Sequence, residues 1–116
     1  MAPQSRPIEF PASVILDVSG NGLVKFGPQT ARTRWHVTSV AVQIPGVLTN
    51  TPEAKVYRGE PQPSNFVTGT HTGNNDSDNA VDILLFAGQY VTVQWTGGDS
   101  GVQATATIRG EQVTGS

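Results

Sequence analysis

Alternation of apolar and polar residues near the carboxyl end is the feature that most constrains this fold. From Tyr90 to Thr96 the two kinds of residue alternate strictly, and the segment from Val102 to Ile108 repeats the pattern. A period of two residues is typical of a β-strand with one buried face. The intervening sequence, GGDSG, favours the positive φ angles of a hairpin loop. The sequence therefore predicts an antiparallel hairpin over residues 88–110, with Trp95 as its largest buried side chain.

Six further segments are rich in β-branched or aromatic residues and are bounded by glycine, proline or polar turns. They cover residues 13–18, 23–26, 30–45, 55–58, 66–70 and 80–86. The first two flank the turn sequence SGNG and are expected to pair as a hairpin, and the last is expected to be buried on both faces. No segment has the apolar period of a helix. Seven to nine strands are expected, in an all-β, antiparallel two-sheet sandwich or jelly-roll-like domain.

The longest of these segments changes its buried face part-way along. Trp35 and Val37 fall on one parity, whereas Val40 falls on the other. Because side chains alternate strictly along a regular strand, one extra residue is needed to make this switch. We expect a β-bulge near Thr38 and Ser39, or a strand that bends from one sheet into the other.

The amino terminus differs from the rest of the chain in its proline content. At 116 residues the chain is long enough for one core and too short for two, so we expect one sandwich domain over residues 12–116, preceded by an extended arm over residues 1–11. Its apolar residues suggest that the arm lies on the domain's own sheet or on a neighbouring molecule, and the alternative is a frayed terminus. The candidate interface residues are Pro3, Arg6, Pro7, Ile8, Phe10 and Pro11.

Charge and cysteine content exclude several classes of function. The net charge is −2, and seven cationic residues scattered along the chain do not form the basic stripe that nucleic acids require. Cysteine is absent, so neither a disulfide framework nor a thiolate metal site is possible. The terminus MAPQSRPIEFP lacks the apolar run of a signal peptide, and no stretch is apolar enough to span a membrane. Neither nucleic acid nor a membrane is an expected partner, and the chain is expected to be made in the cytoplasm.

One short motif suggests a protease. GDSG at residues 98–101 is similar to the nucleophile motif of chymotrypsin-like enzymes, and His36 and Asp82 precede Ser100 in that family's order. However, Val102 stands where the motif continues with glycine, and the family's two barrels need about twice this length. A glycine-rich loop explains the same residues, so the chain is not expected to be an enzyme.

The polar segment from Thr70 to Asn79 is expected to be an exposed loop. Together with Asp82, its residues Asp76 and Asp78 supply oxygen ligands that calcium prefers. Their spacing is not that of an EF-hand, because the sixth position from Asp76 is Val81 rather than glycine. A solvated turn is the simpler interpretation of this segment.

No cofactor is expected from the remaining residues. His36 and His71 are the only imidazoles and fall in no zinc-binding pattern. Exposed aromatic residues such as Phe66 or Tyr90 could stack on a sugar, although both tryptophans are more simply assigned to the core.

Three segments together resemble a known group of proteins. They are GPQTARTRWHVTSVAV, AKVYRG and GQYVTVQWTGGDSGVQATATIRG. In pattern and order they resemble the small β-sandwich proteins encoded among the virion structural genes of tailed phages that infect actinobacteria. The resemblance implies a virion component without catalytic residues, either a capsid decoration protein or a tail-associated one. Its partners would be the major capsid protein and copies of itself, or a cell-surface glycan if the chain belongs to the tail.

Overall fold

The computed structural model describes residues 4–46, 48–69, 75–78 and 81–114. These residues form nine β-strands and one short 3-10 turn, η1 (Pro63–Asn65), and contain no α-helix. The strands are β1 (Gln4–Ile15), β2 (Gly22–Phe26), β3 (Thr33–Gln43), β4 (Glu53–Arg58), β5 (Phe66–Gly69), β6 (Asn75–Asp78), β7 (Ile83–Phe86), β8 (Val91–Thr96) and β9 (Gln103–Thr114). The prediction of an all-β fold is confirmed.

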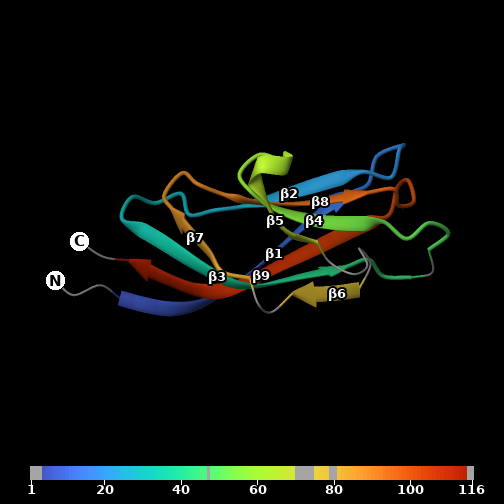
Figure 1. Ribbon diagram of the computed structural model, residues 1–116. Coiled ribbons are helices and arrows are strands. Elements are labelled where there is room, and N and C mark those ends of the chain that lie inside the picture. The colour runs from blue at the N-terminus through green and yellow to red at the C-terminus, as the bar shows by residue number, and fades with distance from the viewer. Residues whose placement is uncertain (1–3, 47, 70–74, 79–80, 115–116) are drawn as a thin grey trace.

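The strands form two antiparallel sheets that face each other (Figure 1). Sheet A has the order β1-β9-β3-β6, and β7 pairs with the other half of the same β3 edge. Sheet B has the order β2-β8-β4-β5. Because β6 and β7 follow one another along a single edge, they take the place of one strand. The result is two four-stranded layers in the order of a jelly roll.

The pairing predicted within residues 88–110 is wrong. β8 pairs with β2 and β4 in sheet B, whereas β9 pairs with β1 and β3 in sheet A. The connection from Gly97 to Val102 therefore carries the chain across the core instead of closing a hairpin. The first predicted hairpin is wrong for the same reason, because β1 and β2 lie in different sheets. An alternating pattern fixes which face is buried, but it is the same for strands side by side and for strands on opposite layers.

The bulge predicted in the longest segment is confirmed. Val37 pairs with Gly110 and Ser39 with Arg109, so Thr38 is the extra residue of β3. The apolar residues of β3 are buried on both sides of this point. The extra residue thus keeps one face of an eleven-residue strand on the core although its sequence changes parity.

Two predictions about the chain between residues 70 and 86 need correction. Asn75–Asp78 pairs with the end of β3 as β6, so this part of the predicted loop is an edge strand, and residues 70–74 and 79 lie outside the described residues. In β7, Leu84 and Phe86 are 46% and 45% exposed, so that strand is buried on one face only. The first prediction was wrong because backbone pairing to β3 outweighs the polar composition of β6. The second was wrong because only one face of β7 lies against the core.

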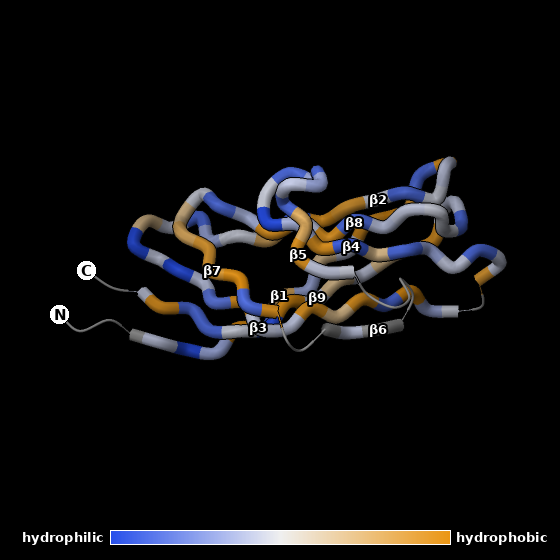
Figure 2. Tube along the Cα trace, viewed as in Figure 1, coloured by the Kyte–Doolittle hydropathy of each residue, from blue (hydrophilic) through white to orange (hydrophobic). Residues whose placement is uncertain are grey.

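The core lies between the two sheets and centres on Trp95, which is fully buried. Trp35 is also buried, and its ring stacks on Phe10 with the centroids 5.0 Å apart. The Trp35 indole N–H donates to the Gln112 amide oxygen at 3.0 Å, which satisfies its polar atom. Figure 2 shows apolar residues along the strands of both sheets and polar residues in the connection between β4 and β5. The expected burial of both tryptophans is confirmed.

The connection between β4 and β5 covers part of the outer face of sheet B. Thr92 points outward from β8 but is fully buried, and its hydroxyl donates to the Gly59 carbonyl oxygen at 2.7 Å. The Tyr90 hydroxyl donates to Glu60, whose carboxylate also lies 3.5 Å from Lys25 Nζ. The hydrogen bond from Tyr90, and then the charge of Lys25, lower the pKa of Glu60. The same hydrogen bond raises the pKa of Tyr90, since the phenol must keep its proton to donate it.

This cluster predicts an acid-sensitive contribution to stability. Because the pKa of Glu60 is lowered in the folded chain, its contribution is complete above the ordinary value of 4.5 and is lost as the pH falls through the lowered pKa. In the wild-type chain, protonation of Glu60 should cause part of the fall in melting temperature that acid produces. We expect the Glu60→Gln variant to lack that part of the fall. Thermal unfolding of both proteins between about pH 6 and pH 3 tests this. Parallel pH profiles for the two proteins would contradict it.

Candidate interaction surface

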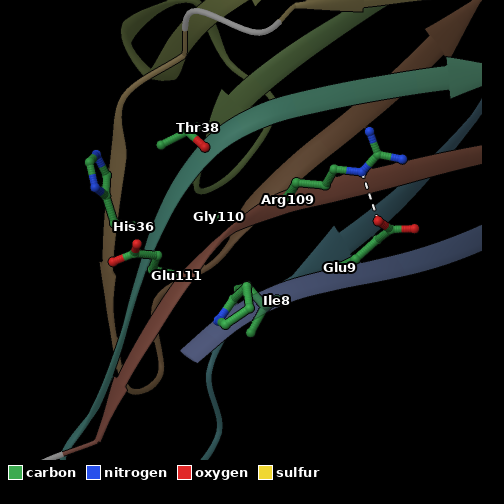
Figure 3. A pocket seen from close by; sticks show the side chains of 8 residues that line it. Ile8, Glu9, His36, Thr38, Arg109, Gly110 and Glu111 are labelled. Atoms are coloured by element: carbon green, nitrogen blue, oxygen red, sulfur yellow. Dashed lines mark hydrogen bonds and ion pairs between the residues drawn. The ribbon is translucent and has the colours of Figure 1, made fainter. Parts of the chain in front are cut away.

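The outer face of sheet A carries a groove that crosses β1, β9 and β3 (Figure 3). Its volume is about 730 Å³, and it is lined by Pro7, Ile8, Glu9, His36, Thr38, Arg109, Gly110 and Glu111. The groove lies at the bulge of β3, where Gly110 on β9 faces Val37. The site therefore lies at the point where the pairing of β3 and β9 shifts by one residue.

The charged groups of the groove are already paired within the chain. Arg109 Nε lies 2.8 Å from a carboxylate oxygen of Glu9, as Figure 3 shows, and His36 Nε2 lies 2.6 Å from Asp82 Oδ1. Glu111 accepts a hydrogen bond from the Ser5 hydroxyl. The groove lining contains no phenylalanine, tyrosine or tryptophan side chain. It offers polar groups to a ligand but no flat apolar ring on which a sugar could stack.

The three residues of the protease-like motif do not meet. His36 and Asp82 form a hydrogen bond, and His36 lies beside Glu111 in the register of β3 and β9. Ser100 lies in the connection that precedes β9, on the far side of Gln103. From Gln103 to Glu111 an extended strand spans roughly 26 Å, so the hydroxyl is far outside hydrogen-bonding range of the imidazole. The glycine-rich motif is a connection between the sheets, and no triad is assembled.

Next to the groove, the outer face of sheet A has an area whose described side chains on β1, β9 and β3 are all uncharged, here called the uncharged patch. It lies where β1, β9 and β3 approach the connections that follow β1 and β3, and Ser13 and Thr105 share a hydrogen bond of 2.8 Å within it. Its outward residues are Pro11, Ser13, Ile15, Ala41, Gln43, Gln103, Thr105 and Thr107. Depletion of charge is typical of the buried centre of protein–protein interfaces.

The segment expected to be an arm is the first part of an edge strand. β1 runs unbroken from Gln4 to Ile15 and pairs with β9 along its whole length, so the expected boundary between residues 11 and 12 falls inside it. The Leu16 N–H donates to the Val102 carbonyl, which shows that the even-numbered residues turn their backbone groups toward β9. Pro7 and Pro11 are odd-numbered and face the free edge, where no N–H is needed.

The candidate interface residues divide into two groups in the structure. Ile8 is only 6% exposed and belongs to the core, and Phe10 packs on Trp35. The apolar area that they offered for a neighbour is therefore used within this chain. Arg6, Pro7 and Pro11 are exposed, and Pro3 lies outside the described residues.

A signal for this edge strand was present in the sequence. Pro3, Pro7 and Pro11 are spaced four residues apart and so share one parity. In an extended strand, residues of one parity turn their backbone groups to the same side, and only an edge strand has a side that needs no donors. Prolines of mixed parity would have been incompatible with pairing to β9.

The described residues offer neither a cluster of metal-ligating side chains nor a membrane-spanning helix. They contain no group of three or more histidine, aspartate or glutamate side chains arranged to hold a metal ion. Parts of the candidate calcium segment, residues 74, 79 and 80, lie outside the described residues. Within residues 4–46, 48–69, 75–78 and 81–114, no helix has the length and apolar content to cross a bilayer.

A chain of similar fold occurs in a solved phage capsid structure. The chain is similar to one in the acid-stable capsid structure of Helicobacter pylori bacteriophage KHP30, with a TM-score of 0.59 and 14% identity over 99% of this chain and 95% of that one. A second similarity, to the structure of infectious bursal disease virus strain Gx, has a TM-score of 0.31 and 13% identity over 97% of this chain and 37% of that one. No protein-family model and no curated protein matches the sequence. At such low identity, the first similarity establishes a shared fold.

Proposed function

We propose that this chain is a non-enzymatic virion structural protein of a tailed phage infecting an actinobacterium, a capsid decoration or minor capsid protein that docks on the particle as a symmetric oligomer. The observation that carries the proposal is the jelly-roll order of the strands, which matches nearly the whole of a chain of similar length in a phage capsid structure. The sequence resemblance to phage β-sandwich proteins supports the same role. The protein would be made in the host cytoplasm and incorporated into the virion.

Docking is proposed to use the uncharged patch together with the exposed residues of β1. Sheet B is less suitable, because the connection between β4 and β5 already covers part of its outer face. Addition of a foreign strand to β1 is also disfavoured, since Pro7 and Pro11 remove two of the donors on its free edge. Side-chain contacts with the major capsid protein are therefore proposed, through Arg6, Pro7, Pro11 and the outward residues of β9.

The alternative function is a tail-associated module that binds a cell-surface glycan. The polar groove on sheet A favours it, because Glu9, His36 and Arg109 could form hydrogen bonds with sugar hydroxyls. The lack of a phenylalanine, tyrosine or tryptophan side chain in the groove lining weakens it.

Imaging of intact particles separates these functions. Electron microscopy of the phage that encodes the chain should find density for this sandwich at symmetry-related positions on the capsid. Density at the tail tip would instead support the glycan-binding alternative. Absence of the chain from purified particles, measured by mass spectrometry, would contradict both.

The docking face predicts the effect of an added charge. Thr107 lies opposite both Pro11 and Ala41 in the register of sheet A, at the centre of the uncharged patch. Thr107→Arg should weaken binding to particles stripped of the protein by about tenfold or more, because an unpaired charge would be buried on docking. The matched control is Gln94→Arg, which places the same half-buried arginine on the outer face of sheet B. Equal binding by the two variants, at equal melting temperatures, would exclude this face.

A further inference from the structure

The molecule is elongated, and its two ends are built from different parts of the chain. Its principal extents are 53, 26 and 22 Å. At one end, here called the turn end, lie the connections that follow β1, β3 and β8 (Figure 1). At the other, the terminus end, lie Gln4 and Thr114 with the connections that follow β2 and β7.

The turn end is held together by hydrogen bonds and is acidic. The Gly98 N–H donates to the Gly20 carbonyl at 3.0 Å, and the Asp99 carboxylate accepts the N–H groups of Thr49 and Asn50. These backbone donors lower the pKa of Asp99, which keeps it ionised. Asp17, Glu53 and Asp99 lie at this end, and the cation Lys55 on β4 follows Glu53 by two residues.

The terminus end is basic. Arg6 on β1 and Arg34 on β3 lie on the two sides of β9 near its last residues, and Arg32 immediately precedes β3. Arg58 ends β4 nearer the middle of the molecule, where it donates to the Leu84 carbonyl and the Gln89 amide oxygen. Glu111, the carboxylate at this end, accepts from the Ser5 hydroxyl.

Carboxylates without an ion-pair partner therefore lie at one end of the long axis, and arginines without one lie at the other. The ion pairs among the described residues use Lys25, His36 and Arg109, and none of them involves Asp17, Glu53, Asp99 or the three arginines of the terminus end. Charges at the two ends are several Debye lengths apart, since that length is about 8 Å at physiological ionic strength. The two ends of one molecule consequently cannot neutralise each other, but the opposite ends of two molecules in contact can.

We infer that copies of this chain associate head to tail, with the acidic turn end of one copy against the basic terminus end of the next. Such a contact is heterologous, so a rotation between copies that closes gives a ring. The inference deepens the oligomeric part of the proposed function and rests on it for its biological role. Sheet extension does not compete with this geometry at β1, because Pro7 and Pro11 disrupt that edge.

Charge reversal at each end tests the contact. One variant carries Arg6→Glu and Arg34→Glu, and the other carries Glu53→Lys, Thr51→Lys and Val18→Lys. All five positions are exposed, and the second set leaves the hydrogen bonds of Asp17 and Asp99 in place. Sedimentation velocity of the purified full chain, over a range of concentrations at about 0.05 M and 0.5 M salt, measures association.

Head-to-tail contact predicts that the wild-type chain self-associates at low salt and at least about tenfold more weakly at high salt. Each variant alone should associate at least about tenfold more weakly than wild type. A mixture of the two should recover association, because the lysine-bearing turn end of one variant meets the glutamate-bearing terminus end of the other. A wild-type chain that stays monomeric, or variants that associate as well as wild type, would overturn the inference. Variants that dissociate but show no recovery on mixing would overturn it as well.

The same variants separate this inference from the proposed function. The turn-end variant, with Glu53→Lys, Thr51→Lys and Val18→Lys, changes none of the residues proposed to dock on the particle. Its binding to stripped particles with unchanged affinity, as a monomer, would keep the virion role and show that docking needs no ring. Loss of particle binding by Thr107→Arg, with self-association intact, would identify the docking face as distinct from the two ends.

Discussion

Trp95→Ala should lower the free energy of unfolding by about 3–5 kcal/mol, the cost of truncating a large aromatic residue in a core. Trp95 is fully buried on the central strand β8, where its register neighbours are Gly22 on β2 and Ala54 on β4. Two such small residues leave the space that the indole fills, and they have no side chains long enough to close the cavity after its removal. For a domain of this size, a loss of that magnitude is a large part of the total stability.

Phe66→Ala is the matched control for that experiment. It also removes an aromatic ring from a strand of sheet B, but Phe66 is half exposed and contacts Tyr57 edge-on at its surface. Chemical denaturation of the two variants should show a loss for Trp95→Ala at least twice that of the control. If the two losses are equal, Trp95 does not anchor the core.

Gly110→Ala should destabilise the chain by about 3 kcal/mol or more. Gly110 lies on the central strand β9, opposite Ile8 on β1 and Val37 on β3. The bulge at Thr38 brings β3 so close that an added Cβ would overlap the His36 carbonyl oxygen and lie 2.9 Å from Val37 Cα. Both are backbone atoms held in the sheet, so they cannot move aside as a flexible side chain would.

Gly69→Ala tests whether the effect comes from that overlap or from glycine replacement in general. Gly69 lies on the edge strand β5, and the nearest atoms to an added Cβ are 3.8 Å away, at ordinary contact distance. Its replacement should change stability by less than about 1 kcal/mol. Equal losses for the two alanine variants, measured by urea unfolding, would mean that the bulge and Gly110 are not in close contact.

Apart from Arg6, the docking and assembly proposals use different parts of the same surface. The uncharged patch lies on a broad face of sheet A, whereas the unneutralised charges lie at the two ends of the long axis. A copy can therefore contact the particle through its face and its neighbours through its ends. This arrangement is the one that a ring lying on a shell requires.

The sequence predicted the local structure correctly wherever a residue pattern is compatible with only one backbone conformation. Alternation in β8 and β9 identified their buried faces, and the change of parity around Thr38 identified the bulge. Proline and glycine excluded helices. The candidate site was predicted less well. Ile8 and Phe10 were correctly noted as apolar, but nothing in their spacing said whether their partner was Trp35 or another molecule.

By itself, then, the sequence determined an all-β chain, most of its strands and which side of each strand is buried, because these follow from the two-residue period and from residues that restrict the backbone. Only the tertiary structure decided that β8 and β9 belong to opposite sheets, that residues 4–11 pair with the end of β9, and that a polar segment forms β6. Strand pairing depends on which partners bury the most surface and satisfy the most backbone groups. That competition is settled between segments far apart in sequence, such as Gln4 and Thr114, and leaves no local pattern.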